Sequence, residues 1–189
     1  VHDFFSELPA SLKEMLERDE DAEQHRIREL TIHPRTRSEF YKGEVHMDCF
    51  DAAVDCGVPL VFNGNLFTRA DCEALQTRHP GMPMMIGRGL IANPALGRQL
   101  HGGQMATHAE LRRYHDALLD AYSREYPADA AHSRMREHMK YLSCCFADSG
   151  KALKAIRKST PRNYPEAAAM LLSLPLADSP AYDPEVFAK

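Results

Sequence analysis

Three short polar segments, each directly after an apolar run, carry side chains that suit anion binding. They are His33-Pro34-Arg35, Asn63-Gly64-Asn65 and Gly87-Arg88-Gly89. Glycine lets the backbone approach a ligand closely, and exposed N–H groups beside a guanidinium match the geometry of a phosphate. Each segment alone also suits an ordinary turn or a structural histidine. Their recurrence after three successive apolar runs predicts one phosphate-binding site.

The apolar runs that precede these segments predict three parallel strands. The runs lie at Leu30–His33, Val58–Phe62 and Met84–Ile86, and consecutive apolar positions are typical of strands covered on both faces. Helical stretches between them imply right-handed crossovers, which bring the carboxyl ends of the strands to one edge, where ligands bind in such folds. Because a complete (β/α)8 barrel needs about 250 residues, we expect a small open sheet or part of a barrel.

Capping residues mark the expected helices around these strands. Thr68 with Asp71 forms a capping-box pattern for a helix through Leu75, and Asn93 is the expected N-cap of a short helix ending at Gly102. Further helices are expected over 8–16 and 45–54.

The second half of the sequence predicts helices throughout. Thr107 is the expected cap of a helix through Tyr126. Three further apolar stripes lie at 135–146, 153–156 and 167–174. Together they predict a small all-α bundle. We therefore expect two domains, a partial barrel over residues 1–104 and a helical domain over 105–189.

Composition excludes several classes of protein. The chain has 189 residues, 44% of them apolar and 26% charged, which is ordinary for a globular protein and excludes collagen, low-complexity disorder and disulfide-dense miniproteins. No apolar run is long enough for a membrane helix, and we see no signal peptide. Five cysteines without a C-x-x-C pair predict free thiols and a cytoplasmic location. Because the sequence does not start with methionine, it is expected to be a piece of something longer.

One segment is basic although the whole chain is acidic. Residues 134–162 carry eight basic and two acidic residues, a net charge of +6 in a chain of net charge −4. Lys151, Lys154 and Lys158 share a helix face, and on the residues alone a solvated face is the favoured interpretation. Contact with RNA phosphates, with Tyr141 available for stacking, is the alternative, and the family resemblance described below makes it the preferred one. The basic residues are Arg134, Arg136, Lys140, Lys151, Lys154, Arg157, Lys158 and Arg162.

The strand-end segments and their flanks resemble those of the tRNA-dihydrouridine synthases. Leu30–Arg37 with Tyr41–Gly43 is similar to the family's T-x-H-x-R-T-R…Y-x-G segment, and Pro59–Thr68 is similar to its P-V-x-x-N-G-D-I-x-T strand. Met84–Leu90 with Asn93-Pro94 resembles V-M-I-G-R-G-x…N-P. Order and spacing also match, and the resemblance runs from residue 30 to about residue 160.

The resemblance implies an α/β fold, the C-terminal portion of a (β/α)8 TIM barrel followed by a helical domain that contacts tRNA. It implies a flavin-dependent oxidoreductase that uses FMN, with NADPH or NADH as reductant, to reduce uridine to 5,6-dihydrouridine in tRNA. His33 would lie near the flavin, and Arg35 would support the site or contact the RNA. The residues that would hold the FMN phosphate are Asn63, Gly64, Asn65, Gly87 and Arg88.

Two departures from the family pattern stand out. Asn65 occupies a position where the family commonly has Asp, and the first five strands have no counterpart in this chain. The family's catalytic cysteine would lie in that missing N-terminal half, so no catalytic residue is expected here and the five cysteines are interpreted as structural. The chain alone should be inactive. Because three strands leave open edges, we expect it to pair with another copy or with the missing half, to swap elements, or to be poorly stable by itself.

Two alternative functions remain open on the sequence. The first is a non-catalytic RNA-binding module on a half-barrel scaffold, and the second is another FMN- or phosphate-binding barrel oxidoreductase. A metal site is not expected, because His108 and His115 share a helix face without a further ligand at metal-binding spacing.

Overall fold

The computed structural model describes residues 28–39, 44–55 and 57–180. They form two compact units. The first combines the described residues up to Asn65 with Glu73–Ile86, and the second combines Leu66–Cys72 with the chain from Gly87 onward. The predicted domain boundary at 104/105 falls inside the second unit. The helix expected over 8–16 lies outside the described residues.

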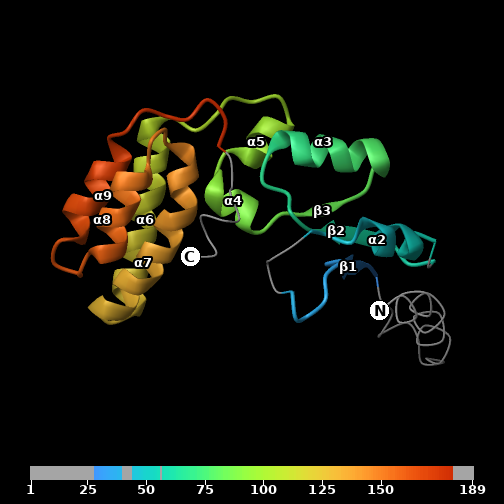
Figure 1. Ribbon diagram of the computed structural model, residues 1–189, viewed down its shortest axis with the longest axis horizontal. Helices are drawn as coiled ribbons and strands as arrows, with labels where there is room; N and C mark the ends of the chain where they lie inside the picture. Colours follow the sequence, from blue (N-terminus) through green and yellow to red (C-terminus); the bar gives the residue numbers. More distant parts are fainter. Residues whose placement is uncertain (1–27, 40–43, 56, 181–189) are drawn as a thin grey trace. The chain divides into compact units, whose positions relative to one another are not determined.

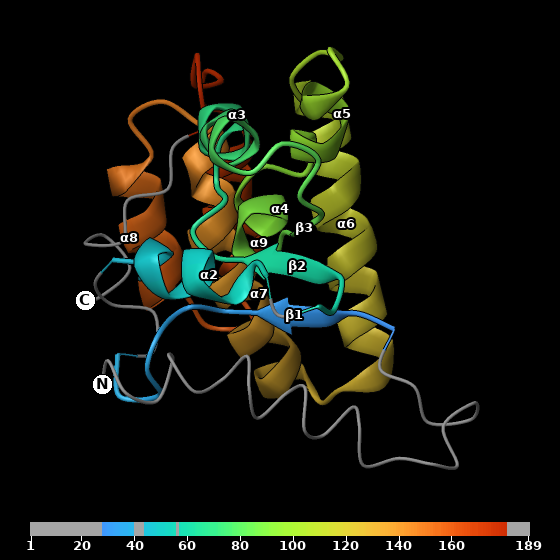
Figure 2. The ribbon, with the colours of Figure 1, turned by 90° about the vertical axis from the view of Figure 1, so that its right-hand side faces the viewer.

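A parallel sheet forms the centre of the first unit (Figure 1). Its strands are β1 (Leu30–Ile32), β2 (Leu60–Asn63) and β3 (Met84–Met85), in the order β1-β2-β3. Leu30 pairs with Leu60, Phe62 pairs with Met84, and Figure 2 shows β1 and β2 side by side. The three predicted strands and their parallel arrangement are confirmed. The three-residue stretch Leu60–Phe62 is buried throughout, as its unbroken apolar pattern predicts.

Two helices flank these strands in sequence. In α2 (Met47–Ala53), the fully buried Phe50 packs edge-on against Phe62, with ring centroids 4.9 Å apart at 89°. Asp51 on the same helix accepts hydrogen bonds from Arg78 Nε at 3.1 Å and His79 Nε2 at 2.8 Å. The bond from Arg78 lowers the pKa of Asp51. This polar cluster therefore holds α2 against the end of α3 (Arg69–Arg78).

The predicted capping box at the start of α3 is confirmed. The Asp71 N–H donates to Thr68 Oγ1 at 3.1 Å, and the Thr68 N–H donates to Asp71 Oδ2 at 2.8 Å. The helix runs to Arg78, one turn beyond the predicted end at Leu75. The division between the two units falls within α3.

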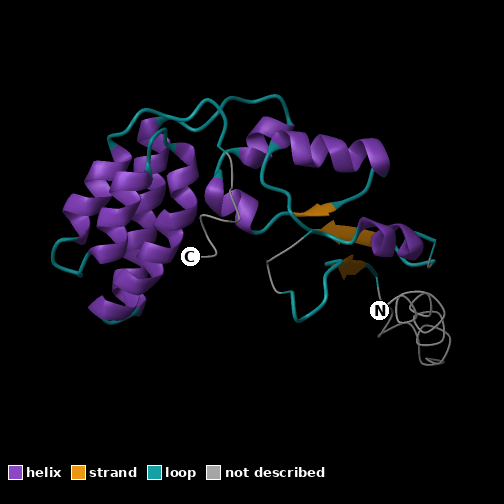
Figure 3. Cartoon of the chain, in the orientation of Figure 1, coloured by secondary structure: helices purple, strands orange, loops and turns teal. Residues whose placement is uncertain are grey.

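The second unit is helical (Figure 3). Its elements are α4 (Arg88–Ala92), α5 (Leu96–Leu100), α6 (His108–Glu125), α7 (Ala128–Leu142), the 3-10 turn η1 (Ser143–Cys145), α8 (Gly150–Lys158) and α9 (Tyr164–Leu172). The last four helices share one apolar cluster in which Met135, Ile156 and Leu171 are fully buried. The four helices predicted after residue 107 are therefore present, and their status as a separate domain stays a prediction.

Helix α6 begins as predicted. The Thr107 hydroxyl accepts from the Glu110 N–H at 3.3 Å, and the Glu110 carboxylate accepts from the Thr107 N–H at 2.8 Å. This reciprocal capping box satisfies two N–H groups that an isolated helix end leaves without partners.

The chain between β3 and α6 differs from the prediction. Gly87-Arg88-Gly89 was expected to be a loop, but α4 begins directly at Arg88. Asn93, the expected N-cap of the next helix, ends α4, and its Oδ1 accepts from the Ala95 N–H at 3.2 Å. Packing of α4 against α7 and η1 explains the difference, because tertiary contacts override the low helix propensity of glycine.

None of the helices in the described part of the chain is both long and apolar enough to cross a membrane.

Candidate functional site

The ends of the three strands are linked to one another by side-chain hydrogen bonds. His33, directly after β1, has its Nδ1 3.0 Å from the Asn63 carbonyl oxygen at the end of β2. The Asn63 side chain donates from Nδ2 to the Met85 carbonyl oxygen at the end of β3, at 2.8 Å. Two predicted site residues, His33 and Asn63, are therefore in contact. The role of the Asn63 side chain in tying β2 to β3 was not visible in the sequence.

The contact with Asn63 determines which nitrogen of the His33 ring carries a hydrogen toward the backbone. A carbonyl oxygen only accepts hydrogen bonds, so Nδ1 carries the hydrogen and donates it. In the neutral ring the other nitrogen, Nε2, then holds a lone pair. That Nε2 atom is buried, and none of the residues that the structure describes forms a hydrogen bond with it. Because buried polar atoms normally have partners, His33 presents a nitrogen suited to a ligand atom.

The Asn63-Gly64-Asn65 turn requires glycine for a packing reason. A Cβ atom at Gly64 would lie 2.5 Å from Cζ and 2.7 Å from Cε1 of Phe62. Phe62 is buried, with only 3% of its surface exposed. The turn can therefore fold back over the Phe62 ring only because Gly64 has no side chain. Gly64 and Asn65 are themselves half-buried.

Gly87 and Arg88 belong to the second unit. Gly87 is the N-cap of α4, and a Cβ atom there would meet nothing within 4 Å. The Arg88 guanidinium lies over the ring of Phe67, with its carbon 5.1 Å from the ring centroid. This cation–π contact orients Arg88, and Phe67 is a site residue that the sequence reasoning missed. The convergence of Arg88 with Asn63, Gly64 and Asn65 on one ligand stays a prediction.

Arg35 is placed differently from the other candidates for RNA contact. Only 8% of its surface is exposed, and its Nε donates to the Glu44 carbonyl oxygen at 3.4 Å. Burial favours support of the loop after β1, and contact of Arg35 with RNA stays a prediction.

A compact network holds the same loop. Glu39 accepts hydrogen bonds from the Thr36 N–H at 2.7 Å and from His46 Nε2 at 2.8 Å. The bond from the Thr36 backbone, followed by those from the Thr36 and His46 side chains, lowers the pKa of Glu39 to about 2. The carboxylate is therefore ionised at neutral pH and fixes the residues that follow His33.

The predicted basic face is present on the second unit. Lys151, Lys154, Arg157 and Lys158 on α8 are exposed, whereas Ala152, Leu153 and Ile156 on the opposite face are buried. We call the residues Arg136, Lys140, Lys151, Lys154, Arg157 and Lys158 the basic strip.

The strip joins two helices. Arg136 on α7 donates from Nη1 to the Arg157 carbonyl oxygen on α8 at 3.2 Å. Burial and the nearby Arg157 guanidinium lower the pKa of Lys140. Positive charges are thus held close together at the α7–α8 junction, an arrangement that favours binding of phosphates.

Arg134 lies outside the basic strip. Its guanidinium contacts the ring of Tyr126, between α6 and α7, with its carbon 3.8 Å from the ring centroid.

The cysteines that the structure describes are free thiols. Cys72 and Cys145 are buried, and Cys145 donates to the Ala92 carbonyl oxygen with an Sγ–O distance of 3.1 Å. Burial raises the pKa of Cys145 to about 12, which keeps it protonated and unreactive. Cys49 and Cys144 are half-buried, Cys56 lies outside the described residues, and the structural role of the five cysteines stays a prediction. Within those residues, no group of three or more His, Cys, Asp or Glu side chains is placed to hold a metal ion.

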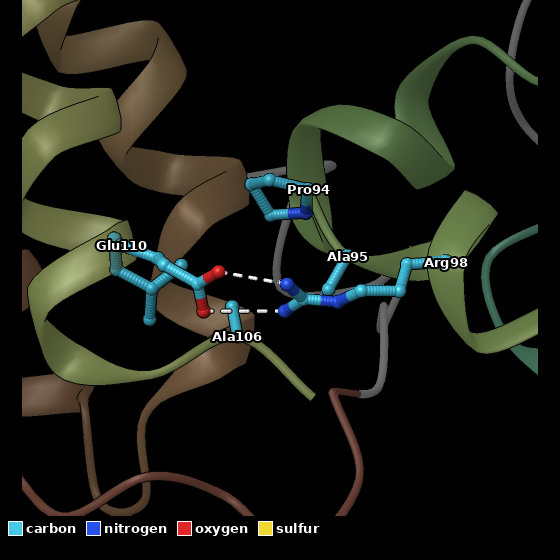
Figure 4. A pocket seen from close by; sticks show the side chains of 6 residues that line it. Pro94, Ala95, Arg98, Ala106 and Glu110 are labelled. Carbon is cyan, nitrogen blue, oxygen red and sulfur yellow. Dashed lines mark hydrogen bonds and ion pairs between the residues drawn. The ribbon is translucent and has the colours of Figure 1, made fainter. Parts of the chain in front are cut away.

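An ion pair crosses a small cavity of about 160 Å³ in the second unit (Figure 4). The cavity lies where α5 meets α6, and the Arg98 guanidinium reaches across it to the Glu110 carboxylate, with an Nη1–Oε1 distance of 2.7 Å. Arg98 also donates to the Gln104 and Met105 carbonyl oxygens, so this ion pair fastens the linker between the two helices.

Comparison with known proteins gives consistent matches. A family model described as dihydrouridine synthase (Dus) matches residues 9–163. The "Probable tRNA-dihydrouridine synthase" of Rhizobium leguminosarum bv. phaseoli is 30% identical over 185 residues, covering 87% of this chain and 56% of the relative. The "tRNA-dihydrouridine(16) synthase" of Cupriavidus necator is 27% identical over 147 residues, covering 68% and 42%. The chain spans about half the length of these curated relatives.

Proposed function

This chain belongs to the dihydrouridine synthase family, and we propose that it is part of an enzyme that reduces uridine to 5,6-dihydrouridine in tRNA. The observation that carries the proposal is the family match over residues 9–163, which includes all three strand-end segments. We propose FMN as the cofactor, with NADPH or NADH as reductant and the cytoplasm as location.

The three-stranded sheet supports a partial barrel. Its strands are parallel and in sequence order, as neighbouring strands are in a (β/α)8 barrel. In the described residues β1 and β3 each pair with β2 alone, so one edge of each is open for a further strand. We propose that this sheet is the C-terminal portion of such a barrel, completed by additional strands.

The residues at the strand ends suit FMN. The buried Nε2 of His33, which bonds to none of the described residues, offers a hydrogen-bond acceptor to a polar edge such as that of the flavin ring. Gly87, with open space at its Cβ position, allows a phosphate to approach the backbone, and Arg88 supplies a fixed positive charge. Asn63, Gly64 and Asn65 complete the proposed phosphate site.

When bound, the flavin supplies hydride chemistry. The residues of this chain then have binding and orienting roles. His33 is held by the Asn63 carbonyl so that its Nε2 keeps one direction, and Arg88 neutralises phosphate charge. The resemblance to the family implies that a cysteine outside this chain protonates the uracil ring, and burial, which raises the pKa of Cys145 to about 12, makes that thiol unsuited to the role.

The basic strip supports tRNA as the partner. Exposed lysines and arginines on one helix face neutralise phosphates irrespective of base sequence, which makes such binding strongly salt-dependent. The same strip supports a second candidate function, an RNA-binding module without catalytic activity.

Comparison of FMN with riboflavin tests the phosphate assignment on the purified chain. The two ligands share the flavin ring, but riboflavin lacks the phosphate. We expect FMN to bind at least about tenfold more tightly, and Arg88→Ala to remove most of that difference, since a hydrogen bond to a charged group contributes about 1.5–3 kcal/mol. Riboflavin affinity should not change in Arg88→Ala.

Two results would separate the candidate functions. Equal affinity of the unmutated chain for FMN and riboflavin would contradict the phosphate site. A chain that binds no flavin but binds tRNA with a steep salt dependence would favour the RNA-binding module. The double variant Lys154→Glu with Arg157→Glu should weaken tRNA binding and leave FMN binding unchanged.

A further inference from the structure

An exposed aromatic ring lies at the turn between α6 and α7. Tyr126 is 39% exposed, although its ring is large and apolar. Its backbone is extended, with φ −132° and ψ 151°, and it ends α6 just before Pro127. The ring is therefore displayed at the corner between two helices of 18 and 15 residues.

The guanidinium of Arg134 lies against this ring. Its carbon is 3.8 Å from the Tyr126 ring centroid, which is a stacking distance. Its hydrogen bond to the Ala130 carbonyl oxygen is long, at 3.4 Å. Among the described residues, no carboxylate lies within ion-pair distance of Arg134. The side chain is half-buried, so a planar cation with no carboxylate partner among the described residues lies over an aromatic ring.

Neighbouring groups hold the corner in place. Tyr122, one helical turn before Tyr126, lies with its ring centroid 5.9 Å away, and its hydroxyl is 2.8 Å from His138 Nε2. Burial lowers the pKa of His138, so this histidine is neutral at pH 7 and adds no charge. The arrangement is organised before any ligand arrives.

The charges around the ring favour a base over a phosphate. Glu125 and Asp129 are exposed on either side of Tyr126 in sequence. Their carboxylates oppose a phosphate at this corner, in contrast to the basic strip. An uncharged planar group meets no such opposition, and RNA-binding proteins stack unpaired bases on aromatic rings and on guanidinium planes.

We propose that Tyr126 and Arg134 form a stacking platform for an unpaired nucleobase of tRNA. This inference rests on the proposed function, because it takes tRNA as the partner. The platform contributes to tRNA affinity through base stacking, whereas the basic strip contributes to it through phosphate neutralisation. The two contributions are separable, since only the second depends strongly on salt.

Four variants of the full 189-residue chain test the platform by tRNA affinity at several salt concentrations. Tyr126→Leu should weaken binding about tenfold, the range expected for one stacked base, with an unchanged salt slope. Tyr126→Phe keeps the ring and should bind as the unmutated chain does. Arg134→Lys keeps the positive charge but loses the planar guanidinium group, so it should weaken tRNA binding as much as Arg134→Gln does. A melting curve for each variant checks that the fold is retained.

The absence of tryptophan from the sequence provides a direct reporter. In Tyr126→Trp the single indole should be quenched by saturating tRNA but not by a fully paired RNA duplex of the same length, because a duplex offers no unpaired base. Lys154→Glu is the matched control, since it should reduce the salt slope without affecting the response of the indole to bound tRNA.

The possible failures are distinguishable. If tRNA binds and Lys154→Glu weakens it, but Tyr126→Leu has no effect or Arg134→Lys behaves as the unmutated chain, the platform is wrong and the proposed function stands. If the unmutated chain does not bind tRNA at all, both the platform and the proposed RNA contact are overturned.

Discussion

Replacing Gly64 by alanine should destabilise the protein through one buried ring. The new Cβ would lie 2.5 Å from Phe62 Cζ, whereas carbon atoms in contact prefer about 3.5–4.0 Å, so the ring has to move by about 1 Å. The ring has little room, because Phe62 is 3% exposed and its neighbour Phe50 packs edge-on at 4.9 Å. Overpacking of this kind costs about 1–3 kcal/mol.

Thermal melting measures this cost. For a chain of this length, about 1 kcal/mol corresponds to a shift of about 2–4 °C, so Gly64→Ala should lower the Tm by about 2–12 °C. Gly97→Ala is the matched control. Nothing lies within 4 Å of a Cβ at this position in α5, and alanine in a helix is favoured over glycine, so the Tm should stay constant or rise.

A double-mutant cycle tests the mechanism. Phe62→Leu shortens the side chain and alone should cost about 1–2 kcal/mol through lost packing. In that background the methyl group of Gly64→Ala has space. The double variant should therefore lose less stability than the sum of the two single losses, by about 1 kcal/mol or more. Strict additivity, or a Gly64→Ala variant as stable as the unmutated chain, would refute the explanation.

Two further predictions concern stability. Glu110 has its pKa lowered to about 2 by Arg98, and then by Thr107, from an ordinary value of 4.5, so its ion pair stabilises the fold above about pH 4.5 and this contribution is lost as the pH falls towards 2. Arg98→Met should therefore reduce the fall in Tm between pH 7 and pH 3, and an unchanged fall would contradict this reasoning. Ile156→Ala should lower the free energy of unfolding by about 2–5 kcal/mol in urea titrations, because the side chain is fully buried. Lys154→Ala, on the exposed face of the same helix, should stay within about 0.5 kcal/mol, and equal losses would show that α8 does not pack as described.

The elements with strong local signals were predictable from the sequence. The strand at Leu60–Asn63 was visible because parallel strands buried on both faces are continuously apolar. The start of α6 was visible because Thr107 and Glu110 form a capping box within four residues. The family was also predicted correctly, since its motifs lie on these same strand ends.

Features that depend on distant residues were not predictable. Arg35 was expected to support the site or contact RNA, and only the fold shows that it is buried with its guanidinium beside the Glu44 carbonyl. The start of α4 at Arg88 was missed because two flanking glycines indicate a turn locally, whereas packing against α7 selects a helix. The Arg98–Glu110 pair joins residues twelve positions apart and has no local pattern.

The two glycine motifs that looked equivalent in sequence have different physical causes. Gly64 is required by the protein itself, because any side chain there meets the Phe62 ring. Gly87 has open space at its Cβ position, so packing does not require glycine there. A close approach of a ligand to the backbone would supply the missing reason. It follows that Gly87→Ala should reduce FMN affinity with little loss of stability. Gly87→Ala therefore tests binding of the FMN phosphate more directly than Gly64→Ala does, because Gly64→Ala also destabilises the fold.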